Sequence, residues 1–167
     1  VLGESEILGQ ERSAWETAQA EGGTRTTLNL LFRHAIETGK RARTETSIGK
    51  HTASVSHAAV EMATEHLGSL AGRRVLVVGA GEMGEGVAVA LVGAGATDIT
   101  VTNRTEARAM ELAQRVGGNI VPFSELSNAL SQSDVLVTCT GAGTAIIDHE
   151  FVTGARSGNT SPLLVVD

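Results

Sequence analysis

A short apolar run that ends at a glycine motif constrains this chain more than any other feature. Val75, Leu76, Val77 and Val78 are followed at once by Gly-Ala-Gly-Glu-Met-Gly at 79–84. A G-x-G-x-x-G between an apolar strand pattern and a helical pattern is typical of a dinucleotide-binding turn, in which the first glycine forms the turn, the second lets a pyrophosphate approach, and the third allows close helix packing. The predicted phosphate loop is therefore Gly79, Ala80, Gly81, Glu82, Met83 and Gly84.

The end of the next predicted strand, residues 98–103, indicates which dinucleotide is bound. Many NAD proteins place an acidic residue there, where it accepts a hydrogen bond from the ribose 2′-hydroxyl. This chain has Asn103, Arg104 and Thr105 instead. A guanidinium can bind a 2′-phosphate through its fork of donors, so the sequence favours NADP over NAD. The alternative interpretation of Arg104 is a solvated surface side chain.

Strand and helix patterns continue to alternate after Arg104. We expect a helix from Thr105 to Val116, a short strand at 119–121, a helix from Ser124 to about Leu130, and a strand at 134–140. Asp148 is expected to cap one more short helix before an apolar strand around Leu164. This alternation predicts an α/β fold, a Rossmann-like doubly wound parallel sheet. The loop at 141–143 should face the nicotinamide half of the crevice, so Thr140 and Gly141 are further cofactor-binding candidates.

The first part of the chain has helical patterns only. We expect a helix from Glu6 to about Ala20, a second helix capped by Thr26 or Thr27, and a third over about 54–67. The predicted inner residues of the second helix are Leu28, Leu31, Phe32, Ala35 and Ile36, and those of the third are Val55, Ala58, Ala59, Met62, Ala63 and His66. We therefore expect an all-helical segment at 1–50, the end of one domain with its connector, followed by a NADP-binding Rossmann domain at 51–167, incomplete at its C-terminus.

Composition and charge narrow the classes of function. A net charge of −6 argues against the whole chain being a nucleic-acid binder. For the basic run at 40–43 we favour ordinary compensation of a helix end, and the alternative interpretation is a contact to a phosphate backbone. The single cysteine, Cys139, lies in an apolar strand pattern, and the five histidines are scattered, so no metal site is expected. No apolar run approaches the roughly 18 residues of a membrane helix, and no signal peptide is evident, so we expect a cytoplasmic protein. The two chain ends suggest a piece of a longer protein.

Four segments, taken together, resemble glutamyl-tRNA reductase in order and spacing. They are Gly-Glu-Ser-Glu-Ile-Leu-Gly-Gln at 3–10, Gly-Lys-Arg-Ala-Arg-Thr-Glu-Thr-Ser-Ile-Gly at 39–49, the glycine loop at 79–84, and Asn-Arg-Thr at 103–105. The first two are far more specific than the glycine loop. The resemblance implies reduction of the glutamyl ester of charged tRNA by NADPH to glutamate-1-semialdehyde, which feeds 5-aminolevulinate, heme and other tetrapyrrole (porphyrin) synthesis.

The resemblance also implies roles for particular residues. The segment that helps to hold the glutamyl group corresponds to Glu4, Ser5, Glu6 and Gln10, although the pattern alone favours helix capping for these four. The basic run at 40–43 becomes a candidate tRNA contact. Cys139 does not match the family's nucleophilic cysteine, which is expected before Val1, so no catalytic residue is expected in this chain and the fragment alone should be inactive. The parent enzyme is expected to be a homodimer through a C-terminal domain that is absent here, and an aminomutase is a candidate partner for transfer of the semialdehyde.

Two other interpretations remain open. A shikimate-dehydrogenase-like NADP oxidoreductase has a similar loop and a similar Asn-Arg-Thr, but it needs an α/β substrate domain with a Lys–Asp pair, whereas residues 1–67 have helical patterns. A non-catalytic NADPH-binding module would be favoured if the sequence upstream carried no cysteine.

Overall fold

The computed structural model describes residues 5–49, 55–141 and 145–167, and for residues 5 and 6 it describes the backbone alone. The chain divides into two compact units, Val1–Val55 and Ser56–Asp167. Each unit is described by itself below.

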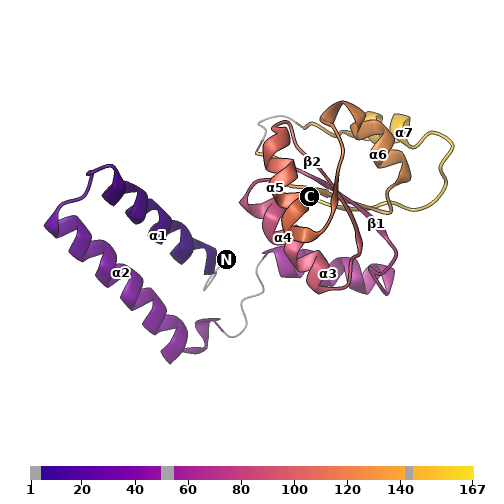
Figure 1. The fold of residues 1–167 in the computed structure, drawn as a ribbon. Coiled ribbons are helices and arrows are strands. Elements are labelled where there is room, and N and C mark those ends of the chain that lie inside the picture. Colours follow the sequence, from indigo (N-terminus) through magenta and orange to yellow (C-terminus); the bar gives the residue numbers. More distant parts are fainter. Residues whose placement is uncertain (1–4, 50–54, 142–144) are drawn as a thin grey trace. The chain divides into compact units, whose positions relative to one another are not determined.

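The first unit is a pair of helices, α1 (Ser5–Ala20) and α2 (Thr26–Glu45), followed by a short 3₁₀ turn, η1 (Ser47–Gly49). The two helices run side by side in opposite directions (Figure 1). Trp15 stacks on Phe32 with ring centroids 6.4 Å apart, and its indole N–H donates to the Asn29 side chain at 2.8 Å. Near the other end, Leu8 of α1 fills the space where a side chain at Gly39 would lie.

Two details of α2 differ from the sequence-based expectation. The N-cap residue is Arg25, with no side-chain capping bond, and Thr26 is already helical. A threonine within the first turn cannot supply the N-cap oxygen, since that oxygen must come from the residue before the helix. Among the predicted inner residues, Ile36 is buried, whereas Leu28 and Leu31 are 44% and 60% exposed. The unit therefore leaves part of the apolar stripe of α2 uncovered.

The second unit is a five-stranded parallel sheet in the order β3-β2-β1-β4-β5. The strands are β1 (Arg74–Val78), β2 (Asp98–Thr102), β3 (Asn119–Ile120), β4 (Val135–Thr138) and β5 (Leu164–Val166). The helices are α3 (Val55–Leu67), α4 (Glu82–Gly93), α5 (Glu106–Val116), α6 (Leu126–Gln132) and α7 (His149–Ala155), with a 3₁₀ turn, η2 (Phe123–Glu125), before α6. The predicted Rossmann-like doubly wound sheet is confirmed (Figure 1).

Two hydrophobic clusters form because side chains of each strand alternate between the two faces of the sheet. Val75 and Val77 of β1 face α3, α4 and α5, whereas Leu76 and Val78 face α6 and α7. Both faces are covered, which explains why the central strands are continuous apolar runs. The cap of α7 is as predicted, because the Asp148 carboxylate accepts from the Phe151 N–H at 2.8 Å. Residues 123–125 form a 3₁₀ turn, so α6 begins at Leu126 rather than at Ser124.

The predicted inner face of α3 is wrong in part. Ala63 is buried, but Met62 and Val55 are 69% and 44% exposed, and the buried side includes Ser56 and Val60 instead. The reason is a close contact with α4, because a Cβ added at Gly86 would lie 2.7 Å from the Ser56 hydroxyl. Small residues on both helices allow this approach and set the rotation of α3.

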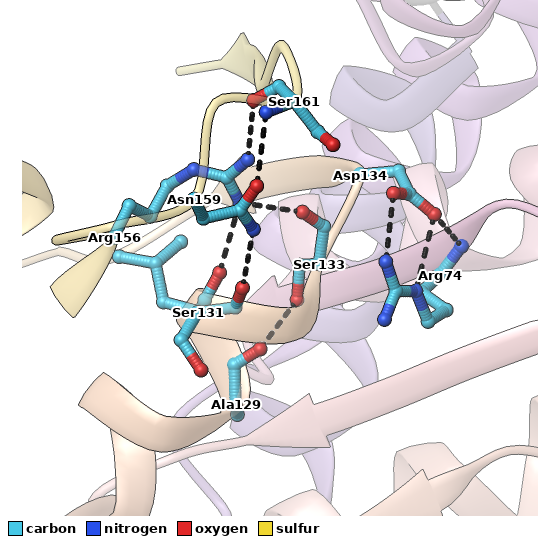
Figure 2. A network of polar contacts seen from close by, with 9 residues as sticks. Arg74, Ala129, Ser131, Ser133, Asp134, Arg156, Asn159 and Ser161 are labelled. Atoms are coloured by element: carbon cyan, nitrogen blue, oxygen red, sulfur yellow. Dashed lines mark hydrogen bonds and ion pairs between the residues drawn. The ribbon is translucent and has the colours of Figure 1, made fainter.

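Arginine side chains tie elements together at the amino edge of the sheet, where β1, β4 and β5 begin. Figure 2 shows Arg156 lying over the end of α6. Its buried guanidinium donates to the carbonyls of Leu130 (3.2 Å), Ser133 (2.7 Å) and Ser161 (2.6 Å). Asn159 donates to the Ser131 carbonyl at 2.8 Å. Carbonyls at a helix end lack intrahelical donors, so these contacts complete the end of α6.

The same edge holds an ion pair between Arg74 and Asp134, also drawn in Figure 2. The Asp134 carboxylate accepts from the Arg74 guanidinium at 3.1 and 3.3 Å and from the Arg74 backbone N–H at 2.9 Å. These bonds from Arg74 hold the pKa of Asp134 below its usual value. The start of β1 is thereby fixed to the start of β4.

Candidate cofactor site at the carboxyl edge of the sheet

Three loops meet where β1, β2 and β4 end. The Gly79 N–H donates to the Thr102 carbonyl at 3.0 Å, and the Cys139 N–H donates to the Val78 carbonyl at 2.9 Å, so the strand ladders continue into the loops. A cavity of about 270 Å³ opens between them. It is lined by Val78, Gly79, Ala80, Gly81, Asn103, Arg104, Thr105, Arg108, Phe123, Cys139, Thr140, Gly141 and Ile146.

The three motif glycines have different surroundings. Gly79 has a φ of 109°, which favours glycine, and an added Cβ would overlap the Cys139 carbonyl. A Cβ at Gly84 would overlap the Gly79 carbonyl, so this glycine lets α4 pack against the turn. At Gly81, in contrast, none of the neighbouring atoms of the described residues lies within 4 Å of an added Cβ. The middle glycine therefore keeps space open rather than relieving a contact within the protein.

Gly81 is also the N-cap of α4, and it provides no side-chain cap. The first N–H groups of a helix lack intrahelical partners and carry the positive end of the helix dipole. An anion placed over Gly81 would meet these donors, as phosphates do at such helix starts. The open space and the uncapped helix start thus fit a pyrophosphate group.

Two arginines line the cavity on the β2 side. Arg104 follows β2, and Arg108 lies further on, in α5. Both residues are exposed, and neither guanidinium has a hydrogen-bond or ion-pair partner in the described part of the chain. Sequence reasoning selected Arg104 and missed Arg108. Arg104 lies before α5 and Arg108 lies within it, so helical periodicity does not relate the two, and the fold of the loop after β2 brings both to the cavity.

Asn103 has a different position from the one expected of a phosphate contact. Its side-chain oxygen accepts from the Ala80 N–H at 3.4 Å, and its side-chain nitrogen donates to the Thr105 carbonyl at 3.0 Å. The amide therefore bridges the loop after β1 and the loop after β2. It positions the glycine turn relative to Arg104.

The structure brings most of the predicted cofactor residues together. Eight of them line the cavity: Gly79, Ala80, Gly81, Asn103, Arg104, Thr105, Thr140 and Gly141. Glu82, Met83 and Gly84 lie in the first turn of α4 instead and are not among the lining residues. Residues 142 and 143 of the predicted loop lie outside the described residues. The apolar lining residues Phe123 and Ile146 were not predicted, since neither belongs to a recognisable motif.

Cys139 lines the cavity but is poorly suited to act as a nucleophile. The side chain is half-buried, and its burial raises the pKa of the thiol, with a smaller increase from the Asp167 carboxylate. A raised pKa lowers the fraction of reactive thiolate. Among the described residues, no three His, Cys, Asp or Glu side chains are grouped as metal ligands would be.

A second cavity, of about 410 Å³, lies where β4 and β5 end. Its lining includes Thr138, Thr140, Ile146, His149 and Asp167. The Thr138 hydroxyl donates to the Asp167 carboxylate. Because Thr140 and Ile146 line both cavities, the two spaces adjoin along one edge of the sheet.

The predicted substrate residues belong to the first unit. Glu4 lies outside the described residues, Ser5 and Glu6 are the first two residues of α1, and Gln10 is an exposed residue of the same helix. Their assignment to the glutamyl group stays a prediction. None of the helices at the described residues has both the length and the apolar character that a membrane crossing requires.

Comparison with known proteins agrees with this arrangement. Residues 61–167 match the family described as shikimate / quinate 5-dehydrogenase, and residues 1–46 match the N-terminal domain of glutamyl-tRNA(Glu) reductase. A glutamyl-tRNA reductase from Priestia megaterium is 43% identical over the whole chain, which spans 38% of that relative.

Solved structures show the same relationship. The glutamyl-tRNA reductase from Methanopyrus kandleri is 46% identical with a TM-score of 0.65, over 99% of this chain and 42% of that one. A quinate dehydrogenase from Corynebacterium glutamicum in complex with NAD shares the fold, at 19% identity and a TM-score of 0.51, over 67% of this chain and 51% of that one. The chain therefore belongs to the glutamyl-tRNA reductase family, and its residues 61–167 belong to the shikimate / quinate 5-dehydrogenase domain family.

Proposed function

We propose that the parent protein reduces glutamyl-tRNA to glutamate-1-semialdehyde with NADPH, and that this chain supplies the NADPH-binding part. One observation carries the cofactor assignment: an open glycine turn, at a helix start without a side-chain cap, shares a cavity with two arginines that have no partner among the described residues. The full-chain similarity to glutamyl-tRNA reductases supports the substrate. We also retain the proposed division into the end of a catalytic domain with its connector, at 1–50, and a NADP-binding domain at 51–167.

The residues of the cavity fit the cofactor group by group. The turn at Gly81 and the start of α4 suit the pyrophosphate. Arg104 and Arg108 suit the 2′-phosphate because they provide two forks of donors, neither of which is paired with a carboxylate of the described residues. Thr140 lines both cavities, and Gly141 lines the first one beside it, so we assign these two residues to the nicotinamide half. When bound, NADPH supplies the hydride that reduces the glutamyl group.

The remaining assignments follow from the family and are part of the proposal. Glu4, Ser5, Glu6 and Gln10 would help to hold the glutamyl group of the tRNA. Because Cys139 does not match the family's nucleophilic cysteine, we assign the nucleophilic thiol to a cysteine elsewhere in the parent protein, and the half-buried position of Cys139 supports this. A homodimer formed through a further domain, transfer of the semialdehyde to an aminomutase, and a cytoplasmic location complete the proposal.

The parent protein tests this proposal directly. Purified full-length protein is expected to oxidise NADPH when glutamyl-tRNA is added, and to form the semialdehyde. Arg104→Ala in that protein should raise the KM for NADPH while leaving kcat at saturating NADPH nearly unchanged, because the 2′-phosphate is remote from the reacting atoms. Absence of NADPH oxidation with glutamyl-tRNA would contradict the proposed activity.

A second candidate is a shikimate-dehydrogenase-like oxidoreductase, which the family match over residues 61–167 favours. The helical first unit and its match to a reductase N-terminal domain argue against it. NADP-dependent oxidation of shikimate by the same preparation would support this candidate. If the preparation binds NADPH but acts on neither substrate, a non-catalytic NADPH-binding module is the better description.

A further inference from the structure

The lining of the cavity combines two kinds of side chain. It includes the cationic side chains of Arg104 and Arg108 and the apolar side chains of Phe123 and Ile146. Phe123 follows β3, the strand next to β2, and Arg104 follows β2. A phosphate alone would need only the arginines, whereas a ligand that also contacts the apolar side chains must combine an anion with a flat or apolar group.

Phe123 is well placed to provide the apolar contact. It is the first residue of η2, directly after Pro122, and it is partly buried. Part of the side chain packs against the buried cluster that contains Val78 and Leu126, and part lines the cavity. It is the aromatic side chain among the lining residues. The buried cluster therefore supports the ring, and the remaining part of the ring is available to a ligand in the cavity.

We propose that Phe123 stacks against the adenine base of the cofactor. This inference rests on the proposed function, because it takes the anion at Arg104 and Arg108 to be the 2′-phosphate. The base is attached to the same ribose as that phosphate, so it must lie within one sugar of the two arginines. Stacking of a base on an aromatic ring increases affinity even where the base makes no hydrogen bonds to the protein. Phe123 is thus a positioning residue for the adenosine half and has no part in the hydride transfer.

Two leucine variants of the 167-residue chain test the effect on affinity, with adenosine 2′,5′-bisphosphate as the probe. Phe123→Leu keeps an apolar side chain against the buried cluster but removes the ring, so binding should weaken about tenfold. The matched control is Phe151→Leu. Phe151 is also partly buried and packs against the same cluster, but it does not line this cavity, so its variant should bind as the wild type does. Isothermal titration calorimetry measures both.

A tryptophan variant gives a signature that a merely structural role would not produce. The only tryptophan of the natural chain is Trp15, in the first unit. Phe123→Trp should retain affinity for adenosine 2′,5′-bisphosphate, and the added fluorescence should be quenched when the base stacks on the indole.

The outcomes separate this inference from the function on which it rests. Unchanged affinity in Phe123→Leu, or binding to Phe123→Trp without quenching, would overturn the role of Phe123 and leave NADPH binding in place. If the wild type binds neither NADPH nor adenosine 2′,5′-bisphosphate, the proposed function fails, and the role of Phe123 fails with it.

Discussion

The two edges of the sheet use arginine in opposite ways. At the amino edge, Arg156 donates to three carbonyls and Arg74 is paired with Asp134. At the carboxyl edge, Arg104 and Arg108 line a cavity, and neither has a partner within the described part of the chain. The same side chain therefore completes the fold at one edge and remains available at the other.

This difference distinguishes arginines that stabilise the fold from arginines that are available to a ligand. A buried guanidinium must have its donors satisfied, because an unpaired buried polar group is costly. An exposed guanidinium in a cavity is hydrated, so leaving it without a protein partner costs little free energy. Changes at the amino edge should therefore alter stability with cofactor affinity preserved, and changes at the carboxyl edge should do the reverse.

The largest expected effect is at the glycine turn. Gly81→Val should abolish NADPH binding, because the new side chain occupies the open space over the start of α4. The fold should persist, since among the residues that the structure describes no neighbouring atom lies within 4 Å of the added Cβ. NADPH fluorescence titration and circular dichroism measure the two properties. The matched control is Gly93→Val, at the other end of the same helix and also in open space, which should bind normally. Undiminished binding by Gly81→Val would contradict the assignment of the loop.

Arg156→Met tests the other edge. It should lower the free energy of unfolding by about 2–4 kcal/mol, because three carbonyls lose a charged donor in a buried position. Urea denaturation gives this value, and NADPH affinity of the folded variant should match the wild type. Arg108→Met is the control, an exposed arginine whose loss should weaken NADPH binding and leave stability within about 0.5 kcal/mol. If Arg156→Met and Arg108→Met changed stability and NADPH affinity in the same way, the proposed difference between the two edges would be wrong.

Arg104→Ala sharpens the comparison within the cavity. It should weaken NADPH binding by on the order of 1.5–3 kcal/mol, the value of a charge-assisted contact, and should affect NADH much less. Titration of both cofactors against wild type and variant gives the ratio. An equal loss for NADPH and NADH would show that Arg104 does not contact the 2′-phosphate.

The smallest effect, and one that depends on pH, is expected for Asp134→Asn. The Arg74 side chain is 50% exposed, so the pair should contribute only about 1 kcal/mol near neutral pH. Because the pKa of Asp134 is lowered in the folded state, this contribution is present above the ordinary value of 3.8 and is lost as the pH falls through the folded value. Unfolding free energies of wild type and variant should converge in acid. A constant difference at every pH would exclude the ion pair as its source.

Much of the second unit could be predicted from local sequence. The run Val75 to Val78 before the glycine motif identified β1 and its turn, because apolar runs and motif spacing are properties of neighbouring residues. Arg108 and Phe123 escaped prediction because their importance depends on which loops the fold brings together. The rotation of α3 escaped for the same reason, since Met62 is a good apolar residue, and it is exposed because Ser56 packs against Gly86 and Val60 and Ala63 pack in the core.

In the first unit, the helices were predictable and their surroundings were not. The stacked pair Trp15 and Phe32 joins α1 to α2, but the periodicity of either helix alone cannot indicate its partner. The exposure of Leu28 and Leu31 shows that a wide apolar stripe does not guarantee a buried face within the unit that carries it. Local patterns define which residues are available to be covered, and the rest of the protein determines what covers them.

The amide of Asn103 has a consequence for altering coenzyme preference. Its side chain is hydrogen-bonded to the Ala80 N–H and to the Thr105 carbonyl at the same time, so the proposed diphosphate site, which both coenzymes would share, is held without either arginine. Replacing Arg104 and Arg108 by other residues should therefore change the relative affinity for NADPH and NADH. Replacing Asn103 should lower the affinity for both coenzymes by a similar factor.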